Sequence, residues 1–282
     1  MTERYNEHPE RQWNKFYANN TSNFFKDRKW LHQEFPILNE VTREDSPPTV
    51  LLEVGAGAGN TAFPILKLNK NPNLKVFACD FSKTAVEVIQ NHEEYRDPAS
   101  IGSIEASVWD AAAVGPSEDE PYSLPENILP GSVDVMIMVF IFSALSPEQW
   151  IQAVRNAWYA LKPGALLLFR DYGRGDLAQV RFKKGRWMGD NFYVRGDGTR
   201  VYFFEEEELR RIWGKEGGFE VKSFGVDRRM LVNRQRRLKM YRCWMQAVFR
   251  KPVEGGSDVE TSAVAELADR VATSSMGEEK SV

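Results

Sequence analysis

Short runs of apolar residues, separated by segments with helical periodicity, mark most of the chain. The runs occupy residues 49–54, 74–79, 104–109, 133–140 and 165–169. Each has the length and near-continuous apolar character of a strand that is buried on both faces of a parallel sheet. Between them the apolar spacing predicts helices that begin near Asn60 or Thr61 and that span residues 82–91 and 147–161. Strands alternating with helices predict an α/β fold, with a mostly parallel sheet covered by helices on both faces.

The alternation stops after Phe169 and resumes at Glu205. Residues 170–204 interrupt the pattern of the sheet, so we expect them to carry substrate recognition. A helix over residues 205–214 and strands over 219–226 and 241–249 follow, which brings the predicted sheet to seven strands. A basic loop is expected between the last two strands. It contains Arg228, Arg229, Arg234, Arg236, Arg237 and Lys239.

The two ends of the chain differ in composition from its middle. Residues 1–46 place aromatic and basic side chains at spacings of three and four, as at Trp13, Phe16 and Tyr17, which predicts short helices. Small and acidic residues dominate after Pro252, so this tail is expected to be disordered, with one weak helix near residues 263–272. The predicted organisation is a helical leader (1–46), an α/β domain (47–252) with an insertion (170–204), and a disordered tail (253–282).

The composition is that of a soluble globular protein, with 42% hydrophobic and 27% charged residues among 282. No apolar run approaches the roughly 20 residues of a membrane-spanning helix, so no membrane segment is expected. Cys79, Cys243 and three histidines are too few and too widely spaced for a zinc site or a disulfide framework. We therefore expect no metal and a reducing compartment. The acidic N-terminus suits neither a secretory signal nor a transit peptide, which favours the cytoplasm or the nucleus.

Charge is distributed unevenly along the chain. Residues 170–251 contain 21 lysines and arginines against 11 aspartates and glutamates, a local net charge of +10 in a protein whose total is −3. A basic segment within an acidic protein indicates an anionic partner, and nucleic acid is the most common large one. The alternative is a solvated basic face that acidic loops balance.

A glycine-rich turn follows the first predicted strand. It runs from Glu53 to Asn60 and contains Gly55, Gly57 and Gly59. Glycine lets the backbone turn tightly and approach a ligand, and the start of the next helix offers free amide donors. A dinucleotide-binding turn needs a further glycine where Asn60 stands. The alternating glycines instead resemble the first motif of class I S-adenosylmethionine-dependent methyltransferases, which implies S-adenosylmethionine as the cofactor.

Two acidic residues and one apolar residue lie at the ends of other predicted strands. Asp80 ends the second strand, where a carboxylate binds ribose hydroxyls in doubly wound folds, and Asp110 follows the third. With Gly55 they converge on the edge at which open α/β sheets bind ligands. Val139, at the end of the fourth strand, would supply an apolar wall. Each acid alone also fits an ordinary strand end, and Val139 also fits core packing.

Residues 191–204 interleave aromatic residues with arginines and are predicted to form a β-hairpin. If Asp197 and Gly198 make a two-residue turn, Arg195 lies opposite Arg200. Like charges across a ladder are destabilising, so we expect a phosphate between these arginines. Aromatic and basic residues together are typical of single-stranded RNA recognition. A purely structural hairpin is the alternative.

Several sequence blocks together resemble the eukaryotic tRNA N3-methylcytidine methyltransferases, over about residues 13–252. The blocks are Trp13 with Tyr17, and residues 23–28 (NFFKDR), 55–60 (GAGAGN), 79–82 (CDFS), 169–173 (FRDYG) and 191–204. The resemblance implies a Rossmann-like class I methyltransferase fold and methyl transfer to N3 of a cytidine in the anticodon loop of threonine, serine or arginine tRNAs. Some members of this family act with seryl-tRNA synthetase, which makes a helper protein one implied partner.

The resemblance also implies roles for individual residues of this chain. It implies that six residues contact the cofactor, namely Trp13, Tyr17, Gly55, Asp80, Asp110 and Val139. It implies that six basic residues face the tRNA, namely Lys26, Arg28, Arg170, Lys183, Arg195 and Arg200.

The implied reaction sets modest chemical demands. Cytidine N3 carries a lone pair and no proton, so no general base is obligatory and positioning should dominate the rate. N3 lies on the Watson–Crick edge, so the base must be unpaired or flipped into a pocket. The ring becomes cationic, and a nearby carboxylate would stabilise the developing charge. Asp171, at the end of the fifth strand, is the candidate catalytic residue. An ion pair with Arg170 or Arg174 is the alternative.

Three other functions stay open on the sequence alone. The first is an S-adenosylmethionine-dependent methyltransferase for a small molecule or a protein, against which the basic segment argues. The second is a nicotinamide-dependent oxidoreductase, which Asn60 disfavours. The third is a silent RNA-binding module, which the combination of Gly55, Asp80 and Asp110 disfavours. The tRNA isoacceptors, the need for a helper and the oligomeric state stay open too.

Overall fold

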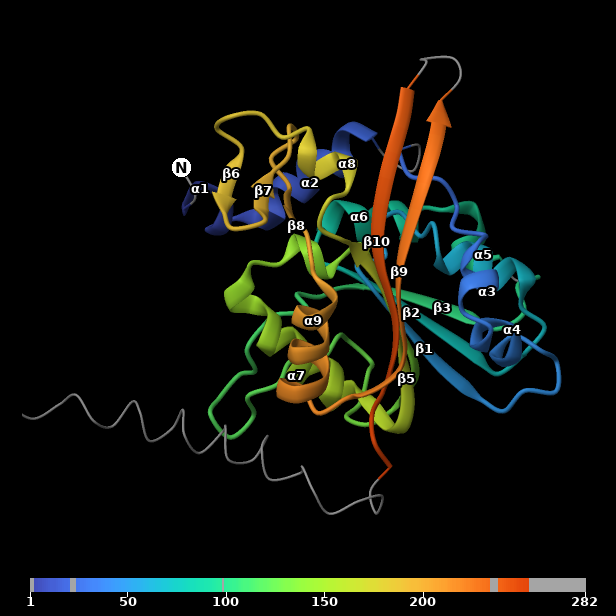
Figure 1. The fold of residues 1–282 in the computed structure, drawn as a ribbon. Coiled ribbons are helices and arrows are strands. Elements are labelled where there is room, and N and C mark those ends of the chain that lie inside the picture. Colours follow the sequence, from blue (N-terminus) through green and yellow to red (C-terminus); the bar gives the residue numbers. More distant parts are fainter. Residues whose placement is uncertain (1–2, 21–23, 98, 234–237, 254–282) are drawn as a thin grey trace, which may run out of the picture.

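The apolar runs of the sequence form a seven-stranded sheet in the computed structural model, which describes residues 3–20, 24–97, 99–233 and 238–253. The strands are β1 (Thr49–Val54), β2 (Leu74–Asp80), β3 (Ser103–Val108), β4 (Val133–Val139), β5 (Leu161–Tyr172), β9 (Glu220–Asn233) and β10 (Leu238–Arg250). Their order across the sheet is β3-β2-β1-β4-β5-β10-β9 (Figure 1). β10 runs antiparallel to β5 and β9, and the other pairs are parallel. The mostly parallel sheet predicted from the sequence is confirmed.

The strand order reverses at the centre of the sheet. β1 pairs with β2 on one side and with β4 on the other. The connections that leave β1 and β4 therefore diverge to opposite faces, and a crevice opens at the carboxyl ends of these strands. The glycine-rich turn begins at this point, directly after Val54.

Helices cover both faces of the sheet (Figure 1). The α-helices are α1 (Glu3–Asn6), α2 (Pro9–Asn20), α3 (Leu31–Glu34), α4 (Ile37–Val41), α5 (Ala62–Leu68), α6 (Lys83–Gln90), α7 (Trp150–Ala160), α8 (Leu177–Val180) and α9 (Glu206–Leu209). Short turns of helix are η1 (Glu93–Arg96), η2 (Phe142–Ala144), η3 (Pro147–Gln149) and the π-helical η4 (Arg210–Glu216). One core layer centres on Phe142, Phe169 and Trp213, and the other on Leu31 and Phe35 from the leader.

Local chemistry explains where the predicted helices begin. Ser82 caps α6, because its hydroxyl accepts a hydrogen bond from the Ala85 amide at 3.2 Å. Pro64 is the third residue of α5, so its missing amide proton falls among groups that have no partner inside the helix. Both helices lie within one or two residues of the expected positions.

The fifth strand is longer than its apolar run. It begins at Leu161, directly after α7, and continues to Tyr172. A register shift opposite β4 accommodates Pro163 and Gly164, which sequence analysis placed outside the strand. β10 pairs with β5 from Leu166 to Tyr172 on the other side, and this pairing extends the strand beyond Phe169.

The basic loop expected between the last two strands is mostly strand. Arg228 and Arg229 lie in β9 and Lys239 lies in β10, where they form part of a long two-stranded ribbon that projects from the sheet (Figure 1). The loop prediction is wrong at these positions because cross-strand pairing continues past the body of the sheet. Arg234, Arg236 and Arg237 lie outside the described residues.

The insertion forms the expected hairpin with an additional strand. β6 (Trp187–Gly189), β7 (Phe192–Val194) and β8 (Arg200–Tyr202) make a three-stranded antiparallel sheet. β7 and β8 pair Val194 with Arg200, and the Arg195 amide donates to the Thr199 carbonyl at 2.7 Å. The predicted register, with Arg195 opposite Arg200, is therefore wrong by one residue. A three-residue loop closed by Gly198 at φ +87° replaces the two-residue turn.

The described part of the leader forms short helices, as predicted. The expected disorder and weak helix of the tail lie outside the described residues, apart from Val253. Among the helices of the described segments, none has the length and apolar character that crossing a membrane requires.

Candidate functional site

A cavity of about 280 Å³ lies at the carboxyl edge of the sheet, in the crevice beside β1 and β4. Three parts of the chain line it. The leader contributes side chains from α2 and from residues 24–28, the sheet contributes the ends of its strands, and the insertion contributes residues 195–200. Concave sites with mostly apolar walls and a few polar groups are typical of small-molecule binding.

All six residues expected to contact a cofactor line this cavity. They are Trp13, Tyr17, Gly55, Asp80, Asp110 and Val139. The rings of Trp13 and Tyr17 stack at 6.1 Å between centroids, at an interplanar angle of 26°. The sequence resemblance therefore selected residues that the tertiary structure brings together from the leader and four strand ends.

The glycine-rich turn is fixed to Asp80. One oxygen of this carboxylate accepts from the Gly57 amide and the other from the Ser82 amide, both at 2.8 Å. Gly57 has φ +60°, and a Cβ atom there would lie 2.5 Å from the Tyr17 hydroxyl. Burial raises the pKa of Asp80 to about 6, although both amide hydrogen bonds act in the opposite direction.

The rest of the cavity has a charged end and an apolar wall. Burial raises the pKa of Asp110, which accepts a hydrogen bond from the Ala112 amide at 2.9 Å. Val139, Phe140 and Ile141 form the apolar wall. Phe140 has φ +62°, a left-handed conformation that bulky side chains rarely adopt, and its ring packs 4.9 Å from that of Tyr172. Backbone strain of this kind persists only where the surroundings enforce it.

These residues fit the implied cofactor. The positive-φ glycines let the main chain approach a bound group, and Asp80 and Asp110 offer carboxylate acceptors for hydroxyl and amino groups. The stacked aromatic residues and Val139 offer apolar surface. A buried carboxylate with a raised pKa at a concave site is also a physical mark of a functional site.

Arg28 joins the leader to the glycine-rich turn. Its guanidinium donates to the Thr61 hydroxyl at 3.1 Å and lies 3.7 Å from the carboxylate of Glu53. Burial raises the pKa of Glu53 to about 7, and the charge of Arg28 opposes this rise. Arg28 also lines the cavity, 5.9 Å from the centroid of the Phe140 ring. The resemblance implied that Arg28 faces the tRNA, and the structure places it in the lining of the cavity.

Asp171 lies behind the cavity and is fully buried. Its carboxylate accepts from the Ser143 amide at 2.9 Å and from the Tyr172 amide at 2.8 Å. Burial raises its pKa to about 6. Among the residues that the structure describes, neither Arg170 nor Arg174 forms an ion pair with Asp171, so the alternative weighed for it does not hold. The structure makes Asp171 a support for the cavity wall, and its charge-stabilising role stays a prediction.

The basic residues expected to face tRNA have three different environments. Arg28, Arg195 and Arg200 line the cavity, whereas Lys26 and Lys183 are exposed and lie outside its lining. Arg170 is 4% exposed and lies between the rings of Trp30 and Trp244. Its expected position facing tRNA is therefore wrong, because partners within the protein surround its guanidinium.

The two hairpin arginines also differ from each other. Arg200 is buried and donates to the Ala144 carbonyl, the Asn6 side chain and the Gln149 side chain. Burial lowers its pKa to about 10. Arg195 is half-buried and lies over the Tyr172 ring at 5.3 Å. Both arginines line the cavity, but hydrogen bonds within the protein hold the guanidinium of Arg200, whereas Arg195 is more exposed.

Sequence reasoning gave no individual role to several residues of the cavity. Phe24, Phe25, Tyr172 and Thr199 all line it. Phe24 and Phe25 are exposed and pack against Phe16, so they form an aromatic rim on the leader. All four belong to sequence blocks that carried the family resemblance, which was the available signal.

The described residues contain no group of three or more histidine, cysteine or acidic side chains arranged to hold a metal ion. The site is therefore built from carboxylates, arginines, aromatic rings and main-chain amides. Such an arrangement can bind a nucleoside-like molecule and hold an aromatic base beside it. It relies on positioning and electrostatics.

Known proteins resemble this chain in sequence and in fold. The family model described as a methyltransferase domain matches residues 52–167. A tRNA(Thr) (cytosine(32)-N(3))-methyltransferase of Saccharomyces cerevisiae is 55% identical over 248 residues, which is 88% of this chain and 38% of that protein. A tRNA N(3)-methylcytidine methyltransferase of Schizosaccharomyces pombe is 50% identical over 88% of this chain and 76% of its own length. This chain thus spans well under half of the budding yeast relative and about three quarters of the fission yeast one.

Solved structures agree on the fold. An S-adenosylmethionine-dependent methyltransferase of Anabaena variabilis superposes with a TM-score of 0.58 at 15% identity, covering 87% of this chain and 94% of its own. One from Methanosarcina mazei has a TM-score of 0.56 at 19% identity, covering 78% and 99%. The fold is that of the class I methyltransferases. Given the sequence identities to the two yeast proteins, the chain belongs to the family of tRNA N3-methylcytidine methyltransferases.

Proposed function

We propose that this protein transfers a methyl group from S-adenosylmethionine to N3 of a cytidine in the anticodon loop of a tRNA, forming 3-methylcytidine. The observation that carries the proposal is that one cavity is lined by all six residues expected to contact the cofactor. The relatives' names supply the acceptor, because they specify tRNA and cytosine N3. The budding yeast relative acts on threonine tRNA by name, so threonine tRNA is the first substrate to test.

Each part of the cavity has a role in this proposal. Asp80 and Asp110 would bind the polar groups of the nucleoside part of the cofactor, and Trp13 and Val139 would cover its apolar surface. When bound, S-adenosylmethionine supplies an electrophilic methyl group on a sulfonium sulfur. The chain's own residues contribute binding, orientation and exclusion of water, since cytidine N3 presents its lone pair without losing a proton.

The acceptor base would enter beside the aromatic residues of the cavity. N3 becomes accessible only when the cytidine is unpaired, and aromatic rings stabilise an unstacked base by stacking. Phe140 and Tyr172 offer such rings, and Arg195 lies over Tyr172 with its charge towards the cavity. Arg195 would therefore contact a loop phosphate or the base itself. Lys26 and Lys183 would add exposed positive charge for the tRNA backbone.

The direct test is methyl transfer from labelled S-adenosylmethionine to total tRNA, followed by nucleoside digestion and mass spectrometry. The expected product is 3-methylcytidine, formed on threonine tRNA transcripts and absent when Asp80 is replaced by Asn. The matched control is Asp134→Asn, which alters a strand carboxylate outside the cavity lining.

A helper protein belongs to the same proposal, and seryl-tRNA synthetase is the first candidate. If label enters tRNA only after its addition, the dependence is established. If no 3-methylcytidine forms with either threonine or serine tRNA, with or without the synthetase, the proposed acceptor is wrong. Label in a protein or small-molecule fraction would then support the alternative methyltransferase.

A further inference from the structure

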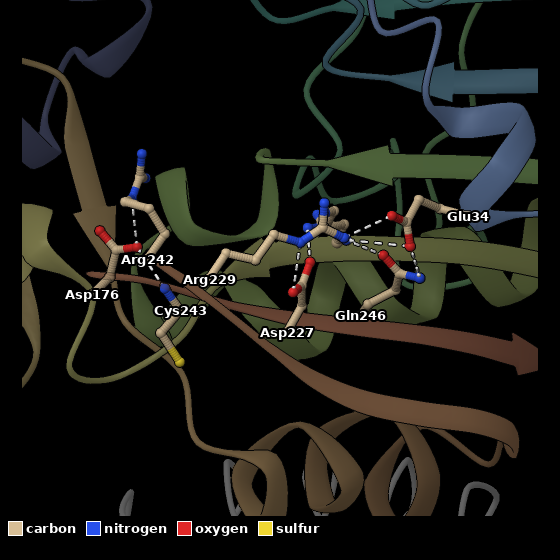
Figure 2. Close-up of polar contacts among 8 residues, drawn as sticks. Glu34, Asp176, Asp227, Arg229, Arg242, Cys243 and Gln246 are labelled. Carbon is tan, nitrogen blue, oxygen red and sulfur yellow. Dashed lines mark hydrogen bonds and ion pairs between the residues drawn. The ribbon is translucent and has the colours of Figure 1, made fainter. Parts of the chain in front are cut away.

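A cluster of polar side chains joins the leader to the β10–β9 end of the sheet. We call it the leader clamp, and it consists of Glu34, Arg170, Asp227, Arg229 and Gln246. Glu34 is the last residue of α3 in the leader, whereas the other four lie on β5, β9 and β10. Figure 2 shows Glu34, Asp227, Arg229 and Gln246 converging, although these side chains come from α3, β9 and β10. None of the five lines the cavity.

Arg170 is the centre of the leader clamp. Its guanidinium donates to the carboxylate of Asp227 at 2.6 Å and to the side-chain oxygen of Gln246. The same guanidinium lies 5.0 Å from the ring centroid of Trp30 and 4.8 Å from that of Trp244. Trp30 belongs to the leader and Trp244 to β10, so one buried cation lies between aromatic rings of the two parts.

Glu34 completes the connection from the leader side. One oxygen accepts from Arg229 at 2.9 Å, and the other accepts from the Gln246 amide at 3.1 Å and lies 3.9 Å from Arg170. Arg229 also donates to Asp227 at 2.8 Å. Burial would raise the pKa of both carboxylates. At Glu34, hydrogen bonds from Gln246 and Arg229 outweigh burial and lower the pKa. At Asp227, hydrogen bonds from Arg229 and Arg170 do the same. Both carboxylates are therefore ionised at neutral pH and hold the arginines.

We propose that Arg170 is a positioning residue that aligns the leader over the cavity. Its side chain holds Trp30, two residues after Arg28, and Arg28 touches the cavity, the Thr61 hydroxyl and the carbonyl of Asn60. Its main-chain carbonyl accepts from the Phe140 amide at 2.8 Å, and Phe140 also lines the cavity. Arg170 thus connects two parts of the cavity lining that are far apart in sequence. The inference rests on the proposed function, since that function gives the cavity its ligand.

The test compares Arg170→Gln with the wild-type protein in the absence and in the presence of ligands. Without cofactor or tRNA, we expect trypsin to cleave after the exposed Lys26 and Lys29 roughly 3 to 10 times faster in the variant, because the leader opens more often. With S-adenosylmethionine alone, we expect its Kd to rise by a similar factor. Arg170→Lys, which keeps the charge and loses the planar fork, should fall between the two.

A matched control and a charge exchange complete the experiment. Arg250→Gln removes an ion pair between β10 and Glu220 of β9, at the end of this strand pair that is remote from Arg229. This variant should leave cleavage of the leader unchanged. Glu34→Arg should accelerate cleavage, and adding Arg229→Glu should restore protection in part. If Arg170→Gln does not fold, the comparison of Glu34→Arg with the Glu34→Arg/Arg229→Glu double variant tests the inference.

Two results would overturn the inference. The first is an Arg170→Gln variant that loses tRNA affinity but keeps wild-type leader cleavage and a wild-type Kd for S-adenosylmethionine. That result would indicate a direct contact between Arg170 and tRNA. The second is a Glu34→Arg/Arg229→Glu double variant in which the leader is cleaved as fast as in Glu34→Arg alone. Wild-type protein that fails to bind S-adenosylmethionine would contradict the proposed function alone, because cleavage of the leader is measured without ligand.

Discussion

At the scale of single residues, burial decides what a predicted site residue does. Asp171 and Arg170 are neighbours on β5, and each was expected to act on the substrate. The structure buries both. The Asp171 carboxylate holds main-chain amides of Ser143 and Tyr172, and Arg170 joins the leader to the sheet. A charged residue at a strand end can therefore hold the walls of the site in place without contacting the ligand.

Asp171→Asn tests whether the buried carboxylate supports catalysis. Loss of its charge and of one amide acceptor should lower turnover at saturating tRNA and cofactor by about 10- to 100-fold. Because burial raises the pKa of Asp171 to about 6, the carboxylate ionises as pH rises through about 6. The wild-type rate should therefore increase across that range, and the variant should lose this part of the pH profile. The measurement is kcat against pH.

Asp176→Asn is the matched control for that experiment. Asp176 is also fully buried and accepts main-chain hydrogen bonds, from Ala178 and Cys243. Neither of these partners lines the cavity, whereas Tyr172, which donates to Asp171, does. Its substitution should lower stability and leave the pH profile of the remaining activity unchanged. Equal turnover of Asp171→Asn and wild type would remove any catalytic role for Asp171.

At the scale of elements, the glycine-rich turn connects the leader to the sheet. Gly57→Ala places a methyl group against the Tyr17 hydroxyl at a left-handed φ, and the same residue donates its amide to Asp80. We expect a loss of about 1–3 kcal/mol in the free energy of unfolding and weaker binding of S-adenosylmethionine. Thermal unfolding and equilibrium titration measure the two effects.

Gly131→Ala separates backbone strain from the contact with Tyr17. Gly131 has the same φ of +60°, and its added Cβ would meet no heavy atom within 4 Å. This variant should lose stability without losing cofactor affinity. If both variants bind the cofactor equally, the approach of Gly57 to Tyr17 has no part in the site.

At the scale of the whole molecule, substitutions of the two hairpin arginines, Arg195 and Arg200, test whether each charge contributes to tRNA binding or to stability. A protein of net charge −3 binds a polyanion through a concentrated basic surface, so affinity for tRNA should fall as salt rises. Arg195→Ala should flatten the plot of log affinity against log salt concentration by roughly one unit, with little change in Tm. Arg200→Ala should chiefly lower Tm, since it removes a buried guanidinium bonded to Ala144, Asn6 and Gln149. Identical salt dependence in both variants and the wild type would place the tRNA elsewhere.

Much of the architecture was predictable because it follows from local patterns. Apolar runs gave the strands of the parallel sheet, and the cap at Ser82 and the early position of Pro64 gave helix starts. The predictions failed where an element depends on a partner distant in sequence. β5, β9 and β10 are longer than their apolar runs because β10 pairs with both β5 and β9. The register of β7 and β8 across the loop at residues 196–198 is not specified by residue type.

The sequence by itself determined the α/β fold and the glycine-rich turn, because apolar pattern and residue type at strand ends carry that information. The six residues expected at the cofactor came from the family resemblance, and two of them, Trp13 and Tyr17, lie in the leader. Only the tertiary structure decided which basic residues stay available to a ligand. Lys26, Lys183 and Arg195 keep access to solvent or to the cavity, and Arg170 is enclosed. Arg200 lines the cavity, but it is buried and hydrogen-bonded within the protein. Burial, ion pairing and hydrogen bonding depend on segments that are far apart in the chain. Glu34 and Arg229 are separated by 195 residues and Asn6 and Arg200 by 194, and no local pattern encodes those contacts.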